Sequence, residues 1–597
     1  MSGPESREWK NATLLQSLAA EFLGTLFLVL TVVLSGGDAV NQYIAIGFVL
    51  MVQVYAFGHI SGAHFNPAVT ATFGLLRKLP PVTALLYIAV QVLGGLTGAL
   101  VAYAVAGPED IVPFTPLPSL ADPVLSAFFA EYAYSTALCV VVASVATAHA
   151  DDPNSHYALS IGFTLLSAVS AVGPVSGAVI NPAVGSAVDL VSTSAEGHPK
   201  FTWVYWAAPL LGSCTAAALY GSLSWLRASE AEVAAQATSP TASDSTSLAY
   251  DLPARVVIFE FVGTFFLTLT AGLGAQPLAV GAILTAFIFA SAGFCGGDFN
   301  PAVTLGALLR YSVTRAELWK SVVVMLSQTA AGVLAGFSAF AIAGDVGWPH
   351  PDGANGDYGA FVYEMMWTGL LVTVVLNTTT PVFAGASQHV GELYRARGST
   401  HGIAIGMTVA VGIIGAGKHG SGSGGVFNPA VGTGLSIAAL AREHDSASAL
   451  WVYWLAPLAG AVAAAGVFKL LHMGNTADDD GDIVGGASAG GGAGGERGAD
   501  SLSGGYVPAT TAPAAARGAA LAGAAAAGAT AGAAGSSATT PLLMITGGEL
   551  GPQFVAAGSV NSSPADSVGS GPGAAAGAGR LQWKATGGDE VASYLSA

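Results

Sequence analysis

Long apolar segments, separated by short polar ones, make up most of the chain up to residue 472. Segments of this length with few or no charged residues are typical of helices that cross a membrane. We predict six spans in the first part of the chain, at 15–35, 42–59, 83–106, 124–148, 157–173 and 202–226. We predict six more at 254–273, 277–293, 318–343, 359–383, 401–416 and 450–472. The fold class predicted by the pattern is an all-α polytopic membrane protein with 12 spans in total.

A tripeptide that occurs four times begins a shorter kind of apolar segment. It stands at Asn66-Pro67-Ala68, Asn181-Pro182-Ala183, Asn300-Pro301-Ala302 and Asn428-Pro429-Ala430. Asn is a strong N-cap because its side-chain oxygen accepts a backbone N–H of the first turn, and Pro at the next position has its φ preset for a helix. The apolar run that follows is only about ten residues long, roughly half of what a crossing needs. We therefore predict four half-helices that dip into the membrane. The alternative is four ordinary helix starts in a soluble core.

Composition decides against the soluble alternative. Hydrophobic residues make up 52% of the chain and charged residues only 9%, against about 25% in soluble proteins, and the mean hydropathy is +0.61. The net charge of −17 lies mostly in loops and the tail, so it indicates no partner, and nucleic acid is not expected. The three cysteines form no CxxC pattern. We find no phosphate loop, metal cluster or nucleophile triad, so neither an enzyme nor a cofactor is expected.

The chain is a tandem duplication. EFLGTLFLVLT around Glu21 corresponds to EFVGTFFLTLT around Glu260, and WVYWAAPLLG at 203–212 corresponds to WVYWLAPLAG at 451–460. We divide the chain into a cytoplasmic N-terminus (1–14), a first unit (15–226), a cytoplasmic linker (227–253), a second unit (254–473) and a tail (474–597). The linker is polar and the tail is Gly/Ala/Ser-rich, so we expect a flexible linker and a disordered cytoplasmic tail.

Each unit is itself doubled. Four acidic residues, Glu21, Glu131, Glu260 and Glu364, lie on predicted spans, and each has a small hydroxyl four residues later on the same helix face. A carboxylate at membrane depth costs about 3 kcal/mol, so each should face a polar interior. We expect a structural role, in which these Glu residues hold the backbone of the re-entrant loops by hydrogen bonds. Each half of a unit contains three spans. Because three is an odd number, the second half is inserted upside down relative to the first.

Basic residues indicate the orientation. If the N-terminus is cytoplasmic, twelve Lys and Arg outside the tail lie on the cytoplasmic side, and only Lys200, Lys418 and Arg442 face out. This bias agrees with the positive-inside rule. We therefore expect a multi-pass integral membrane protein with both termini in the cytoplasm, in a plasma or a vacuolar-type membrane, which the sequence does not distinguish.

These features together resemble the aquaporin (major intrinsic protein) family, over nearly all of 15–226 and 254–472. The resemblance rests on two Asn-Pro-Ala motifs per unit, the paired Glu helices, and HISGAHFNPAVT before the first half-helix. It implies two aquaporin-like bundles in tandem, each with six transmembrane helices and two re-entrant half-helices. It also implies a passive channel for water and other small neutral solutes that excludes protons through its paired half-helices. The alternatives are a glycerol, urea, ammonia or hydrogen peroxide facilitator with little water selectivity, and a non-conducting structural or adhesive membrane protein.

The family has an outer selectivity filter made by four positions in each unit. By the resemblance, these are Ile46, Val169, Ala178 and Val184 in the first unit and Val280, Ile413, Gly425 and Val431 in the second. Most family members have Arg where this chain has Val184 and Val431, and strict water channels have an aromatic or His-containing filter. We therefore expect an apolar filter and a mixed permeability. Lys418 and His419, in the loop before the fourth motif, are candidates to supply the missing cation.

Other positions favour water. Tyr205-Trp206 and Tyr453-Trp454 resemble the aromatic pair of water channels, and Gly185 and Gly432 stand where glycerol channels usually have Asp. Asp298 occupies the place that corresponds to His64, two residues before the Asn. We expect the Asp298 side chain to face away from the pore.

Family members assemble as four copies around a fourfold axis, each with its own pore. Because this chain holds two units in the same orientation, the resemblance predicts a homodimer with four pores. The 27-residue linker, as a flexible coil, reaches roughly 30 Å, which favours adjacent places for the two units in that ring.

Overall fold

The computed structural model describes residues 12–36, 39–107, 111–147, 155–192, 200–237, 252–351, 356–380, 400–417, 422–442 and 445–472. All of them belong to one compact unit, Met1–Ala489. The predicted tail, together with Lys418 and His419, lies outside the described residues.

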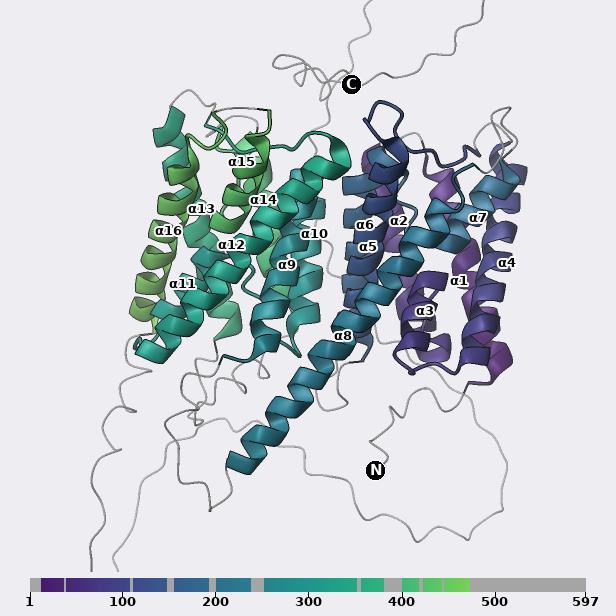
Figure 1. The fold of residues 1–597 in the computed structure, drawn as a ribbon, viewed down its shortest axis with the longest axis horizontal. Helices are drawn as coiled ribbons and strands as arrows, with labels where there is room; N and C mark the ends of the chain where they lie inside the picture. Colours follow the sequence, from purple (N-terminus) through teal and green to yellow (C-terminus); the bar gives the residue numbers. More distant parts are fainter. Residues whose placement is uncertain are drawn as a thin grey trace, which may run out of the picture. The chain divides into compact units, whose positions relative to one another are not determined.

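The described residues form sixteen helices, eight in each repeat (Figure 1). Those of the first repeat are α1 (Leu14–Leu34), α2 (Ala39–Ser61), α3 (Pro67–Leu75), α4 (Pro81–Ala106), α5 (Pro123–Ala146), α6 (Tyr157–Ser176), α7 (Pro182–Val191) and α8 (Val204–Ala237). Those of the second are α9 (Ala254–Gly272), α10 (Pro277–Ser291), α11 (Pro301–Leu309), α12 (Arg315–Ala343), α13 (Gly356–Thr379), α14 (His401–Gly417), α15 (Pro429–Ala439) and α16 (Leu450–Leu471). Each predicted span corresponds to one of twelve long helices, and each predicted half-helix to one of the four short ones, so the predicted fold is confirmed.

Within the described residues, nine helices are long and apolar enough to cross a membrane, and α8, α10 and α14 are the predicted spans outside that set. Helix α10 has 15 residues, about 22 Å of helix, which is less than the roughly 30 Å of a bilayer core. Thirteen of those residues are buried. Because the helix packs against protein along nearly its whole length, its length does not have to match the thickness of the bilayer core.

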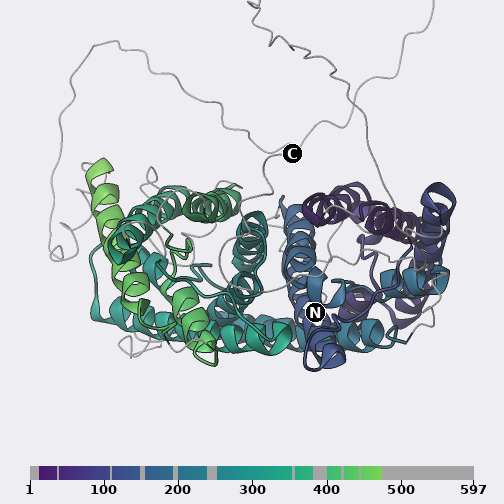
Figure 2. The same ribbon diagram turned by 90° about the horizontal axis from the view of Figure 1, so that it is seen from above.

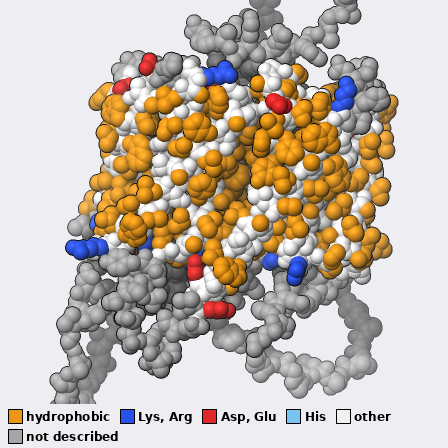
Figure 3. All heavy atoms as spheres, in the orientation of Figure 1, with side chains coloured by type: hydrophobic (Ala, Val, Ile, Leu, Met, Phe, Trp, Pro, Cys, Tyr) orange, Lys and Arg blue, Asp and Glu red, His pale blue; other side chains and the backbone are white. Residues whose placement is uncertain are grey.

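Apolar side chains cover the outside of the two bundles. On the face drawn in Figure 3, hydrophobic atoms fill the middle of the described surface, and Lys, Arg, Asp and Glu lie near its upper and lower edges. Large side chains exposed in this way include Leu93 and Leu100 on α4 and Leu326 and Leu334 on α12. An apolar band of this size on a soluble protein would aggregate, so it is consistent with lipid contact.

Each repeat has an internal twofold pattern of packing. Helix α1 packs on α4 and α5 packs on α8, while the half-helix α3 packs on α8 and its counterpart α7 packs on α4. The same pairs recur in the second repeat, where α9 packs on α12, α13 on α16, α11 on α16 and α15 on α12. Seen from above, the helices of each repeat form a ring (Figure 2). Each half-helix is thereby held by the last helix of the opposite half, which brings the two half-helices of one repeat together.

The two repeats contact each other directly. Helices α5 and α6 of the first repeat pack against α9 and α10 of the second. The Tyr134 hydroxyl hydrogen-bonds with that of Thr270 at 2.9 Å, and the Ser167 hydroxyl donates to the Ala279 carbonyl at 2.8 Å. The two repeats are therefore direct neighbours.

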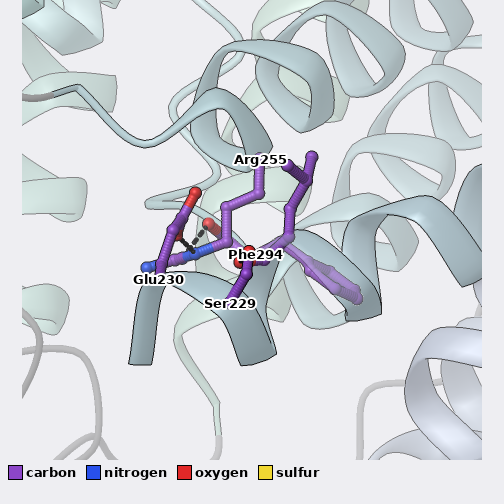
Figure 4. A network of polar contacts seen from close by, with 5 residues as sticks. Ser229, Glu230, Arg255 and Phe294 are labelled. Atoms are coloured by element: carbon purple, nitrogen blue, oxygen red, sulfur yellow. Dashed lines mark hydrogen bonds and ion pairs between the residues drawn. The ribbon is translucent and has the colours of Figure 1, made fainter. Parts of the chain in front are cut away.

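The segment predicted as a flexible linker begins as a helix. Helix α8 continues to Ala237, so residues 227–237 are helical, and 238–251 lie outside the described residues. The carboxylate of Glu230 on this extension pairs with Nε of Arg255 on α9 at 2.5 Å. Arg255 also donates from Nη1 to the Phe294 carbonyl at 2.7 Å (Figure 4). The expectation of a flexible coil throughout is therefore wrong, because these contacts and continued helical hydrogen bonding hold the first part of the linker.

Candidate functional site

The asparagine of each Asn-Pro-Ala motif caps its own half-helix. Asn66 Oδ1 accepts the backbone N–H of Ala68 at 2.8 Å, and the corresponding bonds of Asn181, Asn300 and Asn428 measure 3.0, 2.9 and 3.0 Å. All four asparagines have extended backbones, as N-caps do. The cap therefore occupies the side-chain oxygen and leaves the amide N–H groups for other partners.

Each asparagine donates one of those N–H groups in a hydrogen bond to the residue just before the N-cap of the opposite half-helix. Asn66 Nδ2 donates to the Ile180 carbonyl and Asn181 Nδ2 donates to the Phe65 carbonyl, both at 2.9 Å. In the second repeat Asn300 Nδ2 donates to the Phe427 carbonyl at 2.8 Å. These crossed bonds tie the two half-helices of each repeat together at their N-termini.

The crossed bonds depend on an uncommon backbone conformation. The residue before each asparagine has a positive φ, at 48° for Phe65, 37° for Ile180, 49° for Phe299 and 54° for Phe427. This left-handed conformation is rare for bulky residues and persists only where the surroundings enforce it. It turns the carbonyl of that residue toward the opposite half-helix. Each asparagine then has one amide hydrogen left, and that group can only donate.

The four glutamates hold the loops that lead into the half-helices. Glu21 accepts from the Ser61 hydroxyl, the His64 and Phe65 N–H groups and the Gln91 amide, at 2.6 to 2.9 Å. Glu364 accepts from the Ser423 hydroxyl and from two consecutive loop N–H groups, at 2.7 to 2.9 Å. Glu131 and Glu260 each accept two or more loop N–H groups in the same way. A carboxylate in such a place satisfies backbone donors that would otherwise be unpaired within the membrane.

The sequence analysis did not identify two further residues that hydrogen-bond to these glutamates, Gln91 and Gln328. Each lies fully buried on the third long helix of its repeat and donates from Nε2 to the glutamate, at 2.9 Å in both repeats. Each also donates to a threonine on the half-helix, Thr70 at 2.9 Å and Thr304 at 3.1 Å. A glutamine in the middle of an apolar span, at the same place in both repeats, is the signal that could have found them.

A cavity of about 220 Å³ lies in the second repeat between the two half-helices. Asn300 and Asn428 both line it, and so do all four positions assigned to the second filter, Val280, Ile413, Gly425 and Val431. Most of its remaining wall consists of Leu, Val, Ile, Ala and Gly. In the first repeat, Ile46, Ala178 and Val184 are buried inside the bundle and Val169 is partly buried against the same core.

The aromatic pair and the glycines of each repeat are explained by close packing. The Tyr205 hydroxyl donates to the Ser176 carbonyl and the Tyr453 hydroxyl to the Ser423 carbonyl, both at 2.8 Å. A Cβ added at Gly185 would lie 2.9 Å from Tyr205 Cβ, and one at Gly432 would lie 2.8 Å from Tyr453 Cβ. The tyrosine therefore leaves no room for a larger residue where glycerol channels have Asp.

Asp298 is one of the residues that line the cavity of the second repeat. Oδ2 of Asp298 accepts the Thr304 hydroxyl at 2.9 Å. The position follows from the loop geometry, because the Asp298 N–H is turned toward Glu260 and the side chain then points toward the half-helix that Thr304 belongs to.

In each repeat, two half-helices thus meet at their N-terminal caps inside a bundle of long apolar helices. The family model described as Major intrinsic protein matches residues 8–220 and again 254–468. The chain therefore belongs to the major intrinsic protein family, a family of membrane channels, and contains two of its units in tandem.

The chain is similar to individual members of that family. Nodulin-26 of Glycine max is 36% identical over 216 residues, which is 34% of this chain and 77% of that protein. The glycerol uptake facilitator protein-like 6 of Lactiplantibacillus plantarum is 34% identical over 209 residues, covering 33% of this chain and 93% of that protein. The X-ray structure of the aquaglyceroporin from Plasmodium falciparum matches 35% of this chain and 96% of its own, with 21% identity and a TM-score of 0.31.

Proposed function

We propose that each repeat is a separate pore for water and for other small neutral solutes such as ammonia, urea or hydrogen peroxide. The observation that carries this proposal is the apolar cavity of about 220 Å³ in the second repeat, with the amides of Asn300 and Asn428 in its wall. Since a water molecule takes about 30 Å³ in the liquid, the cavity has room for a short file of waters. Its apolar walls bind water weakly, so water that enters also leaves.

Proton exclusion follows from the half-helices. Each helix N-terminus carries roughly half a positive charge, so two that meet place about one charge at the centre of the pore and repel hydronium. A water that accepts from both remaining asparagine N–H groups has its own hydrogens turned outward. The hydrogen-bonded chain along which a proton would travel is thereby interrupted.

Solutes larger than water are proposed because of the filter. Val184 and Val431 stand at the filter position where most members of the family have a positively charged Arg. None of the other filter positions carries a charge or an aromatic ring. A solute that passes such a filter loses fewer hydrogen bonds that the wall must replace. Discrimination among neutral polar solutes should fall for the same reason.

The proposal is tested by closing the pores one at a time. We choose Ile46→Trp for the first pore and Val280→Trp for the second, because Ala178 and Gly425 have positive φ values of 48° and 64° that a bulky residue would strain. Leu326→Trp is the matched control, since Leu326 is 64% exposed on the outer surface of the bundle.

The readout is stopped-flow light scattering of proteoliposomes for water, glycerol, urea and ammonia. Each single variant should remove part of the water permeability, the double variant should reduce it to the background, and the control should not change it. If one variant abolishes all transport and the other has no effect, one repeat is only a scaffold. If the unmodified chain gives no permeability above empty vesicles, the protein is a non-conducting structural or adhesive member of the family.

We also propose that both termini are cytoplasmic, on the basis of the bias in Lys and Arg. An epitope added before residue 12 should be accessible to antibody only after the cell membrane is permeabilised. Labelling of that epitope in intact cells would reverse the orientation.

We further propose that two chains close a ring of four pores. Phe27 on α1 is 49% exposed, whereas Phe266, which corresponds to it on α9, is 4% exposed at the junction between the repeats. Val411 on α14 is 54% exposed, whereas the corresponding Ser167 on α6 is buried at that junction. The junction inside the chain buries one face of each repeat. The corresponding face of the other repeat stays exposed in each case, and a second chain can cover both exposed faces.

Native mass spectrometry in mild detergent tests the ring. We expect a species of two chains. Val411→Arg should convert it to single chains, because it places a charge in the proposed interface between the two chains. A stable species of one chain or of four chains for the unmodified protein would exclude the dimer.

A further inference from the structure

An aromatic residue stands beside the filter of the second pore. Trp348 lies in the segment between α12 and α13, and residues 347–349 line the same cavity as the filter position Gly425. Among the described residues that line this cavity, Trp348 is the one aromatic residue. The wall of the second pore is therefore not made by the four filter positions alone.

The segment that carries Trp348 is held on both sides of that residue. Val346 is buried, and the Gly347 N–H donates to the Gly272 carbonyl at the end of α9, at 3.3 Å. On the other side, a Cβ added at Gly424 would lie 3.2 Å from Cβ of Pro349, so Pro349 packs on the loop before α15. A wall fixed in this way can select among solutes, because its own position is set by its supports.

The contacts of the Trp348 indole indicate that it extends inward. The imidazole of His350, which is itself exposed, lies against the indole with 4.6 Å between the ring centroids. The indole also packs against the apolar core of the protein. That core includes Val280 and Val431, which line the cavity. The indole therefore lies between an exposed imidazole and the core that surrounds the cavity.

The first repeat uses the aromatic residue of the corresponding segment for packing. Gly177 and Gly424 correspond, since each stands four residues before the Asn of its motif. A Cβ added at Gly177 would lie 2.5 Å from Cδ1 of Phe114, so Phe114 fills the place that Pro349 has in the second repeat. The Phe114 ring also meets the Tyr205 ring edge-on, with 5.8 Å between the centroids.

The order of the two residues is reversed between the repeats. It is Pro113-Phe114 in the first and Trp348-Pro349 in the second. Because Pro349 takes the packing place in the second repeat, Trp348 stands one residue earlier and is free to form part of the pore wall.

The four filter positions of the second pore leave room that an indole can restrict. Gly425 has no side chain, and the other three positions are aliphatic. An indole is large and rigid, and it offers one hydrogen-bond donor and no acceptor. Glycerol has three hydroxyl groups, which would lose hydrogen bonds to water that this wall cannot replace. Water and ammonia are smaller and have fewer hydrogen bonds to lose.

We propose that Trp348 is a specificity-determining residue of the second pore. Its indole limits the size of the solute that passes beside the filter, so that the second pore passes water and ammonia and holds back glycerol. This proposal deepens the proposed function and rests on it, because it requires that the second repeat conducts.

Solute permeability of the second pore alone gives the first test. In proteoliposomes, the full-length chain with Ile46→Trp should pass water and show a glycerol permeability close to that of empty vesicles. A single methylene group in a tight pocket already changes discrimination about tenfold or more, so Trp348→Ala in this chain should raise the glycerol permeability at least about tenfold. Trp348→Phe keeps an aromatic ring and should raise it much less. Trp319→Ala is the matched control, because Trp319 is 55% exposed on α12, and it should have no effect.

Three results of these assays would overturn the proposal. The first is a chain with Ile46→Trp that passes glycerol as readily as water. The second is a glycerol permeability that Trp348→Ala leaves unchanged. The third is an equal rise in water and glycerol permeability in Trp348→Ala, since that would indicate a leak and not a lost size limit.

Thiol labelling separates this proposal from the proposed function. Trp348→Cys is placed in the full-length chain with Cys214→Ser, because Cys214 is the exposed cysteine. Reaction of the solubilised chain with N-ethylmaleimide is followed by its intact mass. Val280→Trp fills the cavity that residue 348 lines, so it should slow the labelling of Trp348→Cys severalfold and leave that of Trp319→Cys unchanged.

The labelling result stands whether or not the chain conducts. If the chain with Ile46→Trp passes no water, the proposed function fails, and labelling still decides whether the side chain at position 348 faces the cavity. Equal labelling of Trp348→Cys with and without Val280→Trp would overturn the proposal.

Discussion

Replacing Gly263 by alanine tests how tightly the second pore is built. A Cβ added at this position of α9 would lie 2.1 Å from Cε1 of Phe299 and 2.4 Å from its Cδ1. The Phe299 ring is completely buried, so it cannot turn into open space. Its backbone is also fixed, because its N–H donates to Glu260 and its carbonyl accepts from Asn428. The added methyl group must therefore displace the central part of the pore.

The magnitude follows from two opposing terms. Overpacking of a filled core costs about 1–3 kcal/mol, and contacts this short place the variant near the upper end. Replacing a helical glycine by alanine contributes about 1 kcal/mol of helix propensity. Gly466→Ala on α16 is the matched control, because a Cβ there meets nothing within 4 Å. Both variants gain the same helix propensity. The difference between their free energies of unfolding, about 3 kcal/mol, therefore measures the cost of overpacking alone.

Thermal unfolding in detergent and water permeability measure this effect. At about 2–4 °C per kcal/mol for a unit of this size, the Tm of Gly263→Ala should lie about 6–12 °C below that of Gly466→Ala. In the Ile46→Trp background, Gly263→Ala should also lower the water permeability of the second pore. Equal Tm values for the two glycine variants would refute the argument, since they would mean that Phe299 relaxes without cost.

Three further predictions concern the filter, the loop anchors and the junction. Val184→Arg together with Val431→Arg should narrow the permeability toward water, and an unchanged solute profile in stopped-flow assays would show that the filter lies elsewhere. Glu364→Gln should lower the free energy of unfolding by about 1–3 kcal/mol because its NH₂ group would face N–H donors; a Tm equal to that of the unmodified chain would contradict this. Arg255→Ala should cost about 1 kcal/mol, because the ion pair with Glu230 is about a quarter exposed. That loss should shrink in high salt, and a Tm difference independent of salt would count against the ion pair.

The sequence by itself determined the elements of this fold. Apolar length predicted the twelve spans, and the Asn-Pro-Ala tripeptide predicted the four half-helices with their caps. Both signals are local, since hydropathy sums over neighbouring residues and the Asn66 cap bond reaches only two residues along the chain, to Ala68. The internal repeats, visible as matching strings around Glu21 and Glu260, then fixed the family and the tandem arrangement.

Only the tertiary structure decided which groups meet. The bond from Asn66 to the Ile180 carbonyl joins residues 114 apart in the chain, and the left-handed backbone of Ile180 has no local sequence signal. Gln91 and Gln328 looked like isolated polar residues until the structure brought them to the glutamates and threonines of other helices.

The partner of the Asp298 side chain and the helical start of the linker were decided in the same way. A carboxylate two residues before a cap has several possible partners, and in the folded chain Oδ2 of Asp298 accepts the hydroxyl of Thr304 on the half-helix. The polar composition of 227–253 indicates exposure to water, but contacts of Glu230 with α9 and continued helical hydrogen bonding keep its first part folded. Local free energy along the chain specifies the helices, whereas the orientation of a side chain depends on partners that only folding brings within hydrogen-bond distance.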